Sequence, residues 1–89
     1  MDKTALEHFR MKTLNFLIDK DNLYDPIKRR NLVTKIANCF LDEDYQGIYS
    51  ALLAVDINCI SSALYANTCY ELAEELASIC PSVITQKKD

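Results

Sequence analysis

The residues that could carry out chemistry in this chain are few, and His8 is the first to consider. It is the only histidine, and it stands between Glu7 and Phe9 on the more polar side of an expected helix. A catalytic base or a metal-binding imidazole needs partners from the cysteine, histidine, aspartate and glutamate set. No recognisable pattern of such partners surrounds it. We therefore interpret His8 as a solvated surface residue and predict that the protein is not an enzyme.

Four cysteines are the next candidates, as metal ligands or as disulfides. Zinc and iron–sulfur sites usually draw on cysteines that lie close together in the sequence. Here successive cysteines are separated by 20, 10 and 11 positions: Cys39, Cys59, Cys69 and Cys80. Cysteine is also a common buried residue. We predict reduced core thiols in a cytoplasmic protein that has no signal peptide, no metal and no cofactor, with a metal site or a disulfide as the less favoured alternatives.

Charged residues form two further groups whose spacing could serve binding. Three acids share one side of the expected last helix: Glu71, Glu74 and Glu75. A solvated helix face is the simpler interpretation, and an acidic patch facing a basic partner is the functional one. Four bases gather in the second helix: Lys28, Arg29, Arg30 and Lys35. A surface network with nearby aspartates is the simpler interpretation, and an anion or nucleic-acid contact is the alternative.

The composition indicates which elements must position these residues. The chain has 89 residues with one glycine and two prolines, whereas β-rich folds use such residues at their turns. We predict an all-α protein, a compact bundle of four to five short helices. Residues 1–81 form a single domain, and residues 82–89 form a tail that Val83 and Ile84 could anchor. The hydrophobic spacing predicts helices over residues 4–18, 26–41, 45–55, 57–66 and 68–79.

Capping residues set the expected helix boundaries. Thr4 with Glu7, and Thr68 with Glu71, match capping boxes. Asp25 followed by Pro26 is a strong helix start, and Pro81 is a strong stop. The acids of residues 42–44 suit the positive end of the third helix. Asp56 is expected to cap a separate fourth helix.

The stretch from Tyr45 to Tyr65 is expected to organise the fold, because it carries a single charge, Asp56. A helix that is apolar most of the way round is either central or still needs a partner. That mid-span acid disfavours a membrane helix. Self-association of the third and fourth helices is one alternative, through small residues that permit close approach: Gly47, Ser50, Ala51 and Ala54.

Residues 46–86 contain no lysine or arginine, so this half of the chain is uncharged to acidic. The net charge of −3 favours a basic or mixed protein surface as partner and disfavours nucleic acid and membranes. Tyrosines are frequent in interfaces, and at least one of Tyr45, Tyr49, Tyr65 and Tyr70 is expected to contact the partner. A DNA-reading helix-turn-helix is disfavoured, because the third helix offers only Gln46 and Ser50 as polar groups.

These observations predict a small protein that masks a partner protein by steric and electrostatic occlusion. An immunity protein, an inhibitor and an export chaperone all fit this description. The expected contact residues are Asp42, Glu43, Asp44, Tyr45 and Tyr49, with Glu71, Glu74 and Glu75 as a further acidic patch. Two alternatives remain: a nucleic-acid-associated regulator that uses Lys28, Arg29, Arg30 and Lys35, and a structural homodimer.

Overall fold

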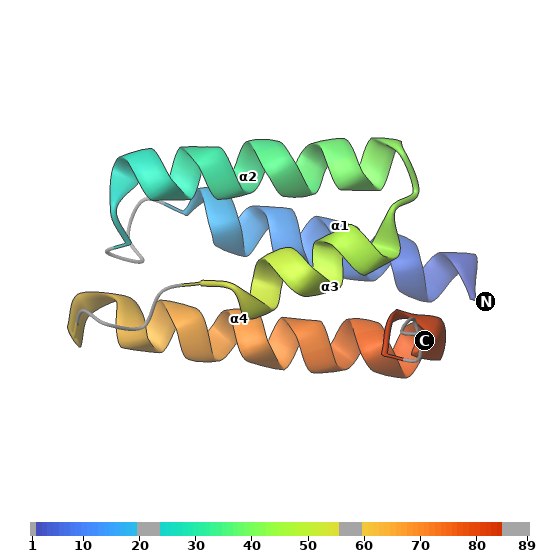
Figure 1. Cartoon of the computed structure of the whole chain (residues 1–89). Coiled ribbons are helices and arrows are strands. Elements are labelled where there is room, and N and C mark those ends of the chain that lie inside the picture. Colours follow the sequence, from blue (N-terminus) through green and yellow to red (C-terminus); the bar gives the residue numbers. More distant parts are fainter. Residues whose placement is uncertain (1, 20–23, 56–59, 85–89) are drawn as a thin grey trace.

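The computed structural model describes residues 2–19, 24–55 and 60–84, without the side chains of residues 60–62. It contains α1 (Lys3–Ile18), α2 (Pro26–Leu41), α3 (Tyr45–Leu53), α4 (Ile60–Ile79) and the short 3-10 helix η2 (Pro81–Val83). No strand occurs in these ranges, and the predicted all-α bundle is confirmed. Helices α1 and α3 each pack against both α2 and α4, so they lie between α2 and α4 (Figure 1).

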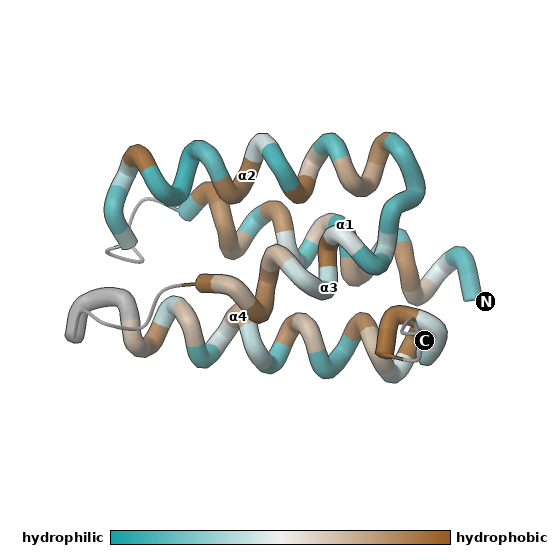
Figure 2. Tube along the Cα trace, in the orientation of Figure 1, coloured by the Kyte–Doolittle hydropathy of each residue, from teal (hydrophilic) through white to brown (hydrophobic). Residues whose placement is uncertain are grey.

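The core is built around α3, as the apolar sequence of that helix predicts. Ile48 and Leu52 are fully buried on α3, and they belong to one core cluster with buried residues of every other α-helix, such as Phe9, Ile36 and Leu76. Figure 2 shows the contrast between the hydrophilic link that joins α2 to α3 and the hydrophobic end of α3. The helix therefore starts in a polar, exposed corner and runs into the interior.

Three aspartates cap the first three helices. The Asp25 carboxylate accepts the Lys28 N–H at 2.9 Å, with Pro26 in the first turn, which confirms the predicted start of α2. The predicted Thr4–Glu7 capping box is wrong. Asp2 caps α1 by accepting the backbone N–H groups of Thr4 and Ala5, so Thr4 lies inside the helix.

The predicted division of the last helix at Thr68 is also wrong, because α4 continues through this position. The Thr68 hydroxyl donates to the Leu64 carbonyl at 3.1 Å, the i−4 bond of a threonine inside a helix. The buried stripe of α4 also continues across residue 68: Tyr65, Ala66, Cys69, Leu72, Ala73 and Leu76. A stripe at unbroken helical spacing outweighs a local capping pattern. The predicted cap at Asp56 lies outside the described residues.

Small residues on α3 serve packing within the molecule. A Cβ atom on Gly47 would lie 2.9 Å from the Cys39 sulfur of α2, and Ala51 is buried. Ser50 and Ala54 are exposed. Of the four small residues considered for self-association, Gly47 therefore lets α3 approach α2, and Ala51 belongs to the core. Cys39, Cys69 and Cys80 are free and buried, as predicted, and Cys59 lies outside the described residues.

The chain beyond Ile79 turns back onto the bundle. Pro81 opens η2, which contacts both α3 and α4, and Val83 is only 3% exposed. Ile84 is 54% exposed. Val83 therefore anchors the start of the expected tail, and Ile84 does not. None of the described helices combines the length and the hydropathy that crossing a bilayer requires.

Candidate protein-binding site

The link between α2 and α3, residues Asp42–Tyr45, forms a sharp corner with a well-defined backbone. The Glu43 N–H donates to the Phe40 carbonyl at 3.2 Å, and the Asp44 N–H donates to the Cys39 carbonyl at 2.8 Å. These two bonds make a Schellman motif, whose central position takes a left-handed conformation and usually carries glycine. Glu43 occupies that position with a φ of 56°. A residue with a side chain raises the free energy of the fold there by about 1 kcal/mol.

Asp44 supports the corner rather than serving contact alone. Its carboxylate accepts the Gly47 N–H at 2.9 Å and caps α3, as the sequence predicts for this acidic segment. The same carboxylate lies 3.9 Å from the Cys39 sulfur. Burial, reinforced by the Asp44 charge, raises the pKa of the Cys39 thiol. A substitution of Asp44 would therefore alter folding as well as any contact, although Asp42, Glu43 and Asp44 are all exposed.

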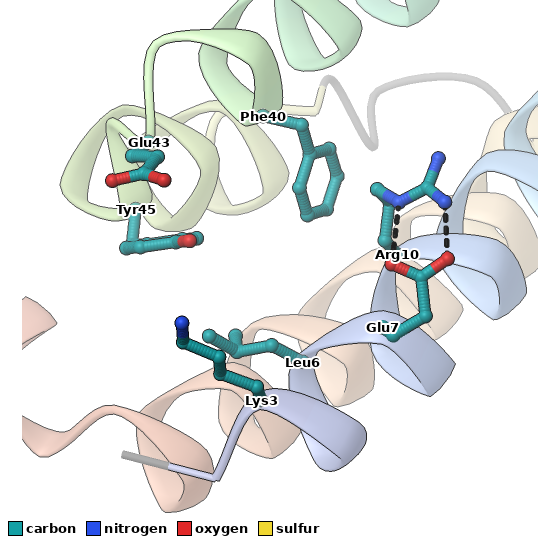
Figure 3. A pocket seen from close by; sticks show the side chains of 7 residues that line it. All are labelled: Lys3, Leu6, Glu7, Arg10, Phe40, Glu43 and Tyr45. Carbon is teal, nitrogen blue, oxygen red and sulfur yellow. Dashed lines mark hydrogen bonds and ion pairs between the residues drawn. The ribbon is translucent and has the colours of Figure 1, made fainter.

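Two hollows meet at the corner, and Glu43 and Tyr45 line both. The α1-side hollow has a volume of about 310 Å³, and Figure 3 shows its apolar floor of Leu6 and Phe40. Lys3 stands on the α1 wall, across from Tyr45. Arg10 donates to Glu7 and lowers the pKa of that carboxyl. This hollow thus has two acids and two bases, and its charges balance.

The second space, which we name the acidic hollow, has a different electrostatic character. Its volume is about 310 Å³, and its lining residues come from the corner and from the chain around η2: Glu43, Asp44, Tyr45, Gln46, Cys80, Ser82 and Val83. Two of these are acids, and none is lysine or arginine. The Gln46 Oε1 atom is buried and accepts no hydrogen bond from the residues that the structure describes. Among the residues that the structure describes, the lining of this space therefore carries two negative charges and no positive one.

Tyr45 forms the ridge between the two hollows. Its side chain is half-buried, and burial, with smaller contributions from Glu43 and Cys80, raises the pKa of its phenol. The hydroxyl therefore remains a hydrogen-bond donor at neutral pH. The face of its ring can also contact a cation, because the ring quadrupole is negative there. Tyr45 is thus the predicted contact residue that the structure places best.

Other predicted contact residues lie away from this corner. Tyr49 is half-buried against the core, and it lines neither hollow. Glu71 and Glu74 are exposed on α4, and Glu75 pairs with Lys12 of α1 at 2.8 Å. The described lining of the two corner hollows contains none of these glutamates. The acids of the corner and the glutamates of α4 therefore lie at different places on the bundle.

Tyr65, one of the four tyrosines among which at least one contact residue is expected, is only 1% exposed, so its side chain belongs to the core. Its ring stacks on Tyr24 at 4.2 Å and lies 5.0 Å from Phe16. The Tyr70 hydroxyl donates to the Val55 carbonyl at 3.4 Å, which joins α4 to the end of α3. These aromatic residues hold the bundle together. Of the four tyrosines considered as contact residues, Tyr45 and Tyr49 lie on α3, the helix that begins at the corner.

The four cations of the predicted basic patch line two different hollows on α2. Lys28 and Lys35 line a groove between α2 and α3, whereas Arg29 and Arg30 line a separate hollow beside Ile27. The two lysines are seven positions apart, which is about two helical turns, so they share one side of α2. The four cations therefore do not form a single surface for a nucleic-acid backbone.

The remaining candidates for chemistry stay apart in the fold. His8 is exposed, as predicted. Within the described ranges, no group of three or more histidine, cysteine, aspartate and glutamate residues is placed to hold a metal ion. The sequence reasoning missed Gln46 and Ser82 as lining residues. Gln46 directly follows Tyr45 and could have been included, whereas Ser82 joins the site only because η2 folds back.

Comparisons with models of protein families, with curated proteins and with solved structures gave no match.

Proposed function

We propose that this chain is a non-enzymatic protein-binding domain that docks a basic surface of a partner at the corner between α2 and α3. The observation that carries the proposal is the acidic hollow. Glu43, Asp44 and Gln46 line one space that has no lysine or arginine among its described lining residues. A lysine or arginine side chain of a partner would supply the missing donors and the missing charge.

The backbone at Glu43 supports the same proposal. Glycine would relieve the left-handed conformation at this position, yet the chain carries a glutamate there. Strained residues are often retained where the side chain is needed for function. The Glu43 carboxylate is exposed, and Tyr45 beside it offers a hydroxyl donor and a ring face. Together they suit a cationic side chain that lies across the ridge.

The α1-side hollow suits an apolar anchor from the same partner. Leu6, Phe40 and Tyr45 give it apolar surface, and the charges of Lys3, Glu7 and Arg10 surround it. An apolar pocket with a charged rim is the usual arrangement of an interface hot spot. A partner that fills both hollows would cover the end of the bundle where α1 begins and α4 ends (Figure 1).

A small domain with this surface would act by covering its partner. Immunity proteins, inhibitors and export chaperones work in this way. The proposal is that this chain has a role of one of these three kinds. A cytoplasmic location belongs to the proposal as well, because Cys39, Cys69 and Cys80 are free thiols. Occlusion requires only a stable complex, so no catalytic group is needed.

The experiment that tests this proposal is site-specific photocrosslinking in the source cells. A photoreactive residue replaces Ser82, which is exposed and lines the acidic hollow, and a matched variant carries it at exposed Asn15 of α1. We expect a partner protein that crosslinks at position 82 and not at position 15. We also expect Glu43→Lys to reduce that crosslink at least about tenfold, as for a central interface residue. Equal crosslinking at both positions, or none at position 82, would contradict the proposal.

A further inference from the structure

The acidic hollow adjoins the last residues that the structure describes. Val83 lines the hollow and is held in the core, with only 3% of its side chain exposed. The Ile84 N–H donates to the Pro81 carbonyl at 3.1 Å and closes η2. Because η2 contacts α3 as well as α4, it lies at the same end of the bundle as the corner (Figure 1). The sequence that follows Ile84 therefore begins beside the acidic hollow.

That sequence contains two lysines. After Lys35 the chain has no lysine or arginine until Lys87 and Lys88, and Asp89 comes next. Val83 and Lys87 are four positions apart, and covalent geometry limits such a separation to about 14 Å. Both lysines are therefore tethered close to the hollow that Val83 lines.

We propose that Lys87 and Lys88 occupy the acidic hollow when no partner is bound, and that a partner must displace them. The inference rests on the proposed function, because the chain's own cations and the partner's cation compete for one site. The carboxylates of Glu43 and Asp44 and the ring of Tyr45 suit an ammonium group from either source. A group tethered over a few residues has an effective concentration in the millimolar range, so the contact forms within one molecule.

The contact is weak enough for a partner to break it. Glu43 and Asp44 are exposed, and ion pairs between exposed residues are individually weak. The Asp44 carboxylate also accepts the Gly47 N–H, so part of its hydrogen-bonding capacity serves the fold. A partner that fills the α1-side hollow as well gains contacts that the two lysines lack. The lysines therefore lower the affinity of the partner without abolishing its binding.

The glutamates of α4 are the alternative acids for these lysines. Glu71 and Glu74 are exposed, and neither lines the acidic hollow. A hollow excludes part of the water that weakens an ion pair, and Tyr45 adds a ring face that a cation can contact. The corner therefore suits the two lysines better than the exposed face of α4 does.

The first test couples lysine amines to nearby carboxylates with a water-soluble carbodiimide, in the purified full-length protein without a partner. Peptide mass spectrometry identifies the joined residues, and a mixture of ¹⁴N and ¹⁵N protein separates bonds within one molecule from bonds between two. We expect Lys87 or Lys88 to join Glu43 at least about tenfold more often than Glu71 or Glu74. Equal coupling to the α4 glutamates, or coupling only between two molecules, overturns the inference.

A charge-matched pair of variants provides a second measurement without a partner. Lys87→Gln with Lys88→Gln is expected to shift the amide signal of Glu43 in ¹⁵N-labelled protein. Arg30→Gln with Lys35→Gln removes the same charge from α2 and is expected to leave that signal in place. If the two variants shift the Glu43 signal equally, or neither does, the inference is overturned.

The same two variants test the competition with the partner. With the photoreactive residue at position 82, Lys87→Gln with Lys88→Gln is expected to raise the partner crosslink about threefold at a subsaturating partner concentration. Arg30→Gln with Lys35→Gln should leave it unchanged. A partner crosslink that both variants leave unchanged overturns the inference, whereas the proposed function stands. A shifted Glu43 signal with no partner crosslink at all supports the contact of the lysines and contradicts the proposed function.

Discussion

The Asp44 carboxylate and the Gly47 backbone fit together with no room for a side chain between them. The carboxylate accepts the Gly47 N–H at 2.9 Å, and an added Cβ on Gly47 would lie 2.8 Å from the Asp44 Cγ atom. The Cys39 sulfur closes the same space from α2, at 2.9 Å from that Cβ position. This contact fixes the first turn of α3, and with it the corner that presents Glu43 and Tyr45.

Gly47→Ala is therefore expected to destabilise the protein, although alanine is the better helix former. The added methyl group must displace the Asp44 cap or the Cys39 side chain, and we expect a loss of about 1–3 kcal/mol. Urea unfolding measures the loss, and Ser50→Ala, at an exposed position of the same helix, should change stability by less than about 0.5 kcal/mol. A Gly47→Ala protein as stable as the unchanged chain would show that the corner has more room.

Glu43→Gly is expected to stabilise the fold, because glycine adopts the left-handed conformation without strain. The expected gain is about 0.5–1 kcal/mol. Asp42 has a φ of −87°, so Asp42→Gly should instead lower stability by about 0.5–1 kcal/mol. Thermal and urea unfolding of the two variants check the opposite signs. If both variants are destabilised alike, the backbone at Glu43 does not carry the strain described above.

Tyr65→Phe is expected to raise stability, because the Tyr65 hydroxyl is buried and makes no hydrogen bond with any part of the chain that the structure describes. Removing a buried polar group that lacks a partner should increase the free energy of unfolding by about 1 kcal/mol. Tyr70→Phe is the matched control, because it removes the bond to the Val55 carbonyl and should lower stability by about 0.5 kcal/mol. A destabilised Tyr65→Phe protein would mean that an ordered water satisfies this hydroxyl.

Stability is expected to fall at alkaline pH through the Cys69 thiol. Burial raises its pKa from 9.0 to about 12, so the unfolded chain loses this proton first. The stabilisation is complete below pH 9 and declines as the pH rises from 9 towards 12. The stability difference between the unchanged protein and Cys69→Ala should narrow by up to about 1.4 kcal/mol per pH unit in that range. Urea unfolding at pH 8, 9 and 10, with reductant, measures it, and a constant difference would contradict the burial of this thiol.

The sequence was sufficient for the features that depend on local chemistry. The Asp25–Pro26 start of α2, the acidic cap of α3 and the stop at Pro81 follow from residues that are neighbours in the chain. The division of α4 at Thr68 was wrong because a capping pattern also occurs inside helices, where the hydroxyl bonds to its own helix. At Thr68 the continuous spacing of buried residues along α4 predicts the helix better than the capping pattern does.

The candidate site could be predicted only in part. The acids and Tyr45 of the corner are neighbours in sequence and were found together. The hollows beside them depend on which distant segments pack there, namely the start of α1 and the η2 turn. The same limit explains Tyr65, whose burial depends on stacking with Tyr24 across the bundle. Residue type identified tyrosines as possible contacts, but only the tertiary packing separates Tyr45 from Tyr65.

The measurement that tests the central claim most directly is the affinity of the crosslinked partner for two charge-reversed proteins. One carries Asp42→Lys with Glu43→Lys at the corner, and the other carries Glu71→Lys with Glu74→Lys on α4, so the net charge changes equally. We expect the corner variant to bind at least about tenfold more weakly at physiological salt, and the α4 variant to bind within about threefold of the unchanged protein. If both variants bind the partner equally weakly, general electrostatic attraction explains the binding, and the corner is not the specific site. Unchanged binding by the corner variant would also contradict the proposed site.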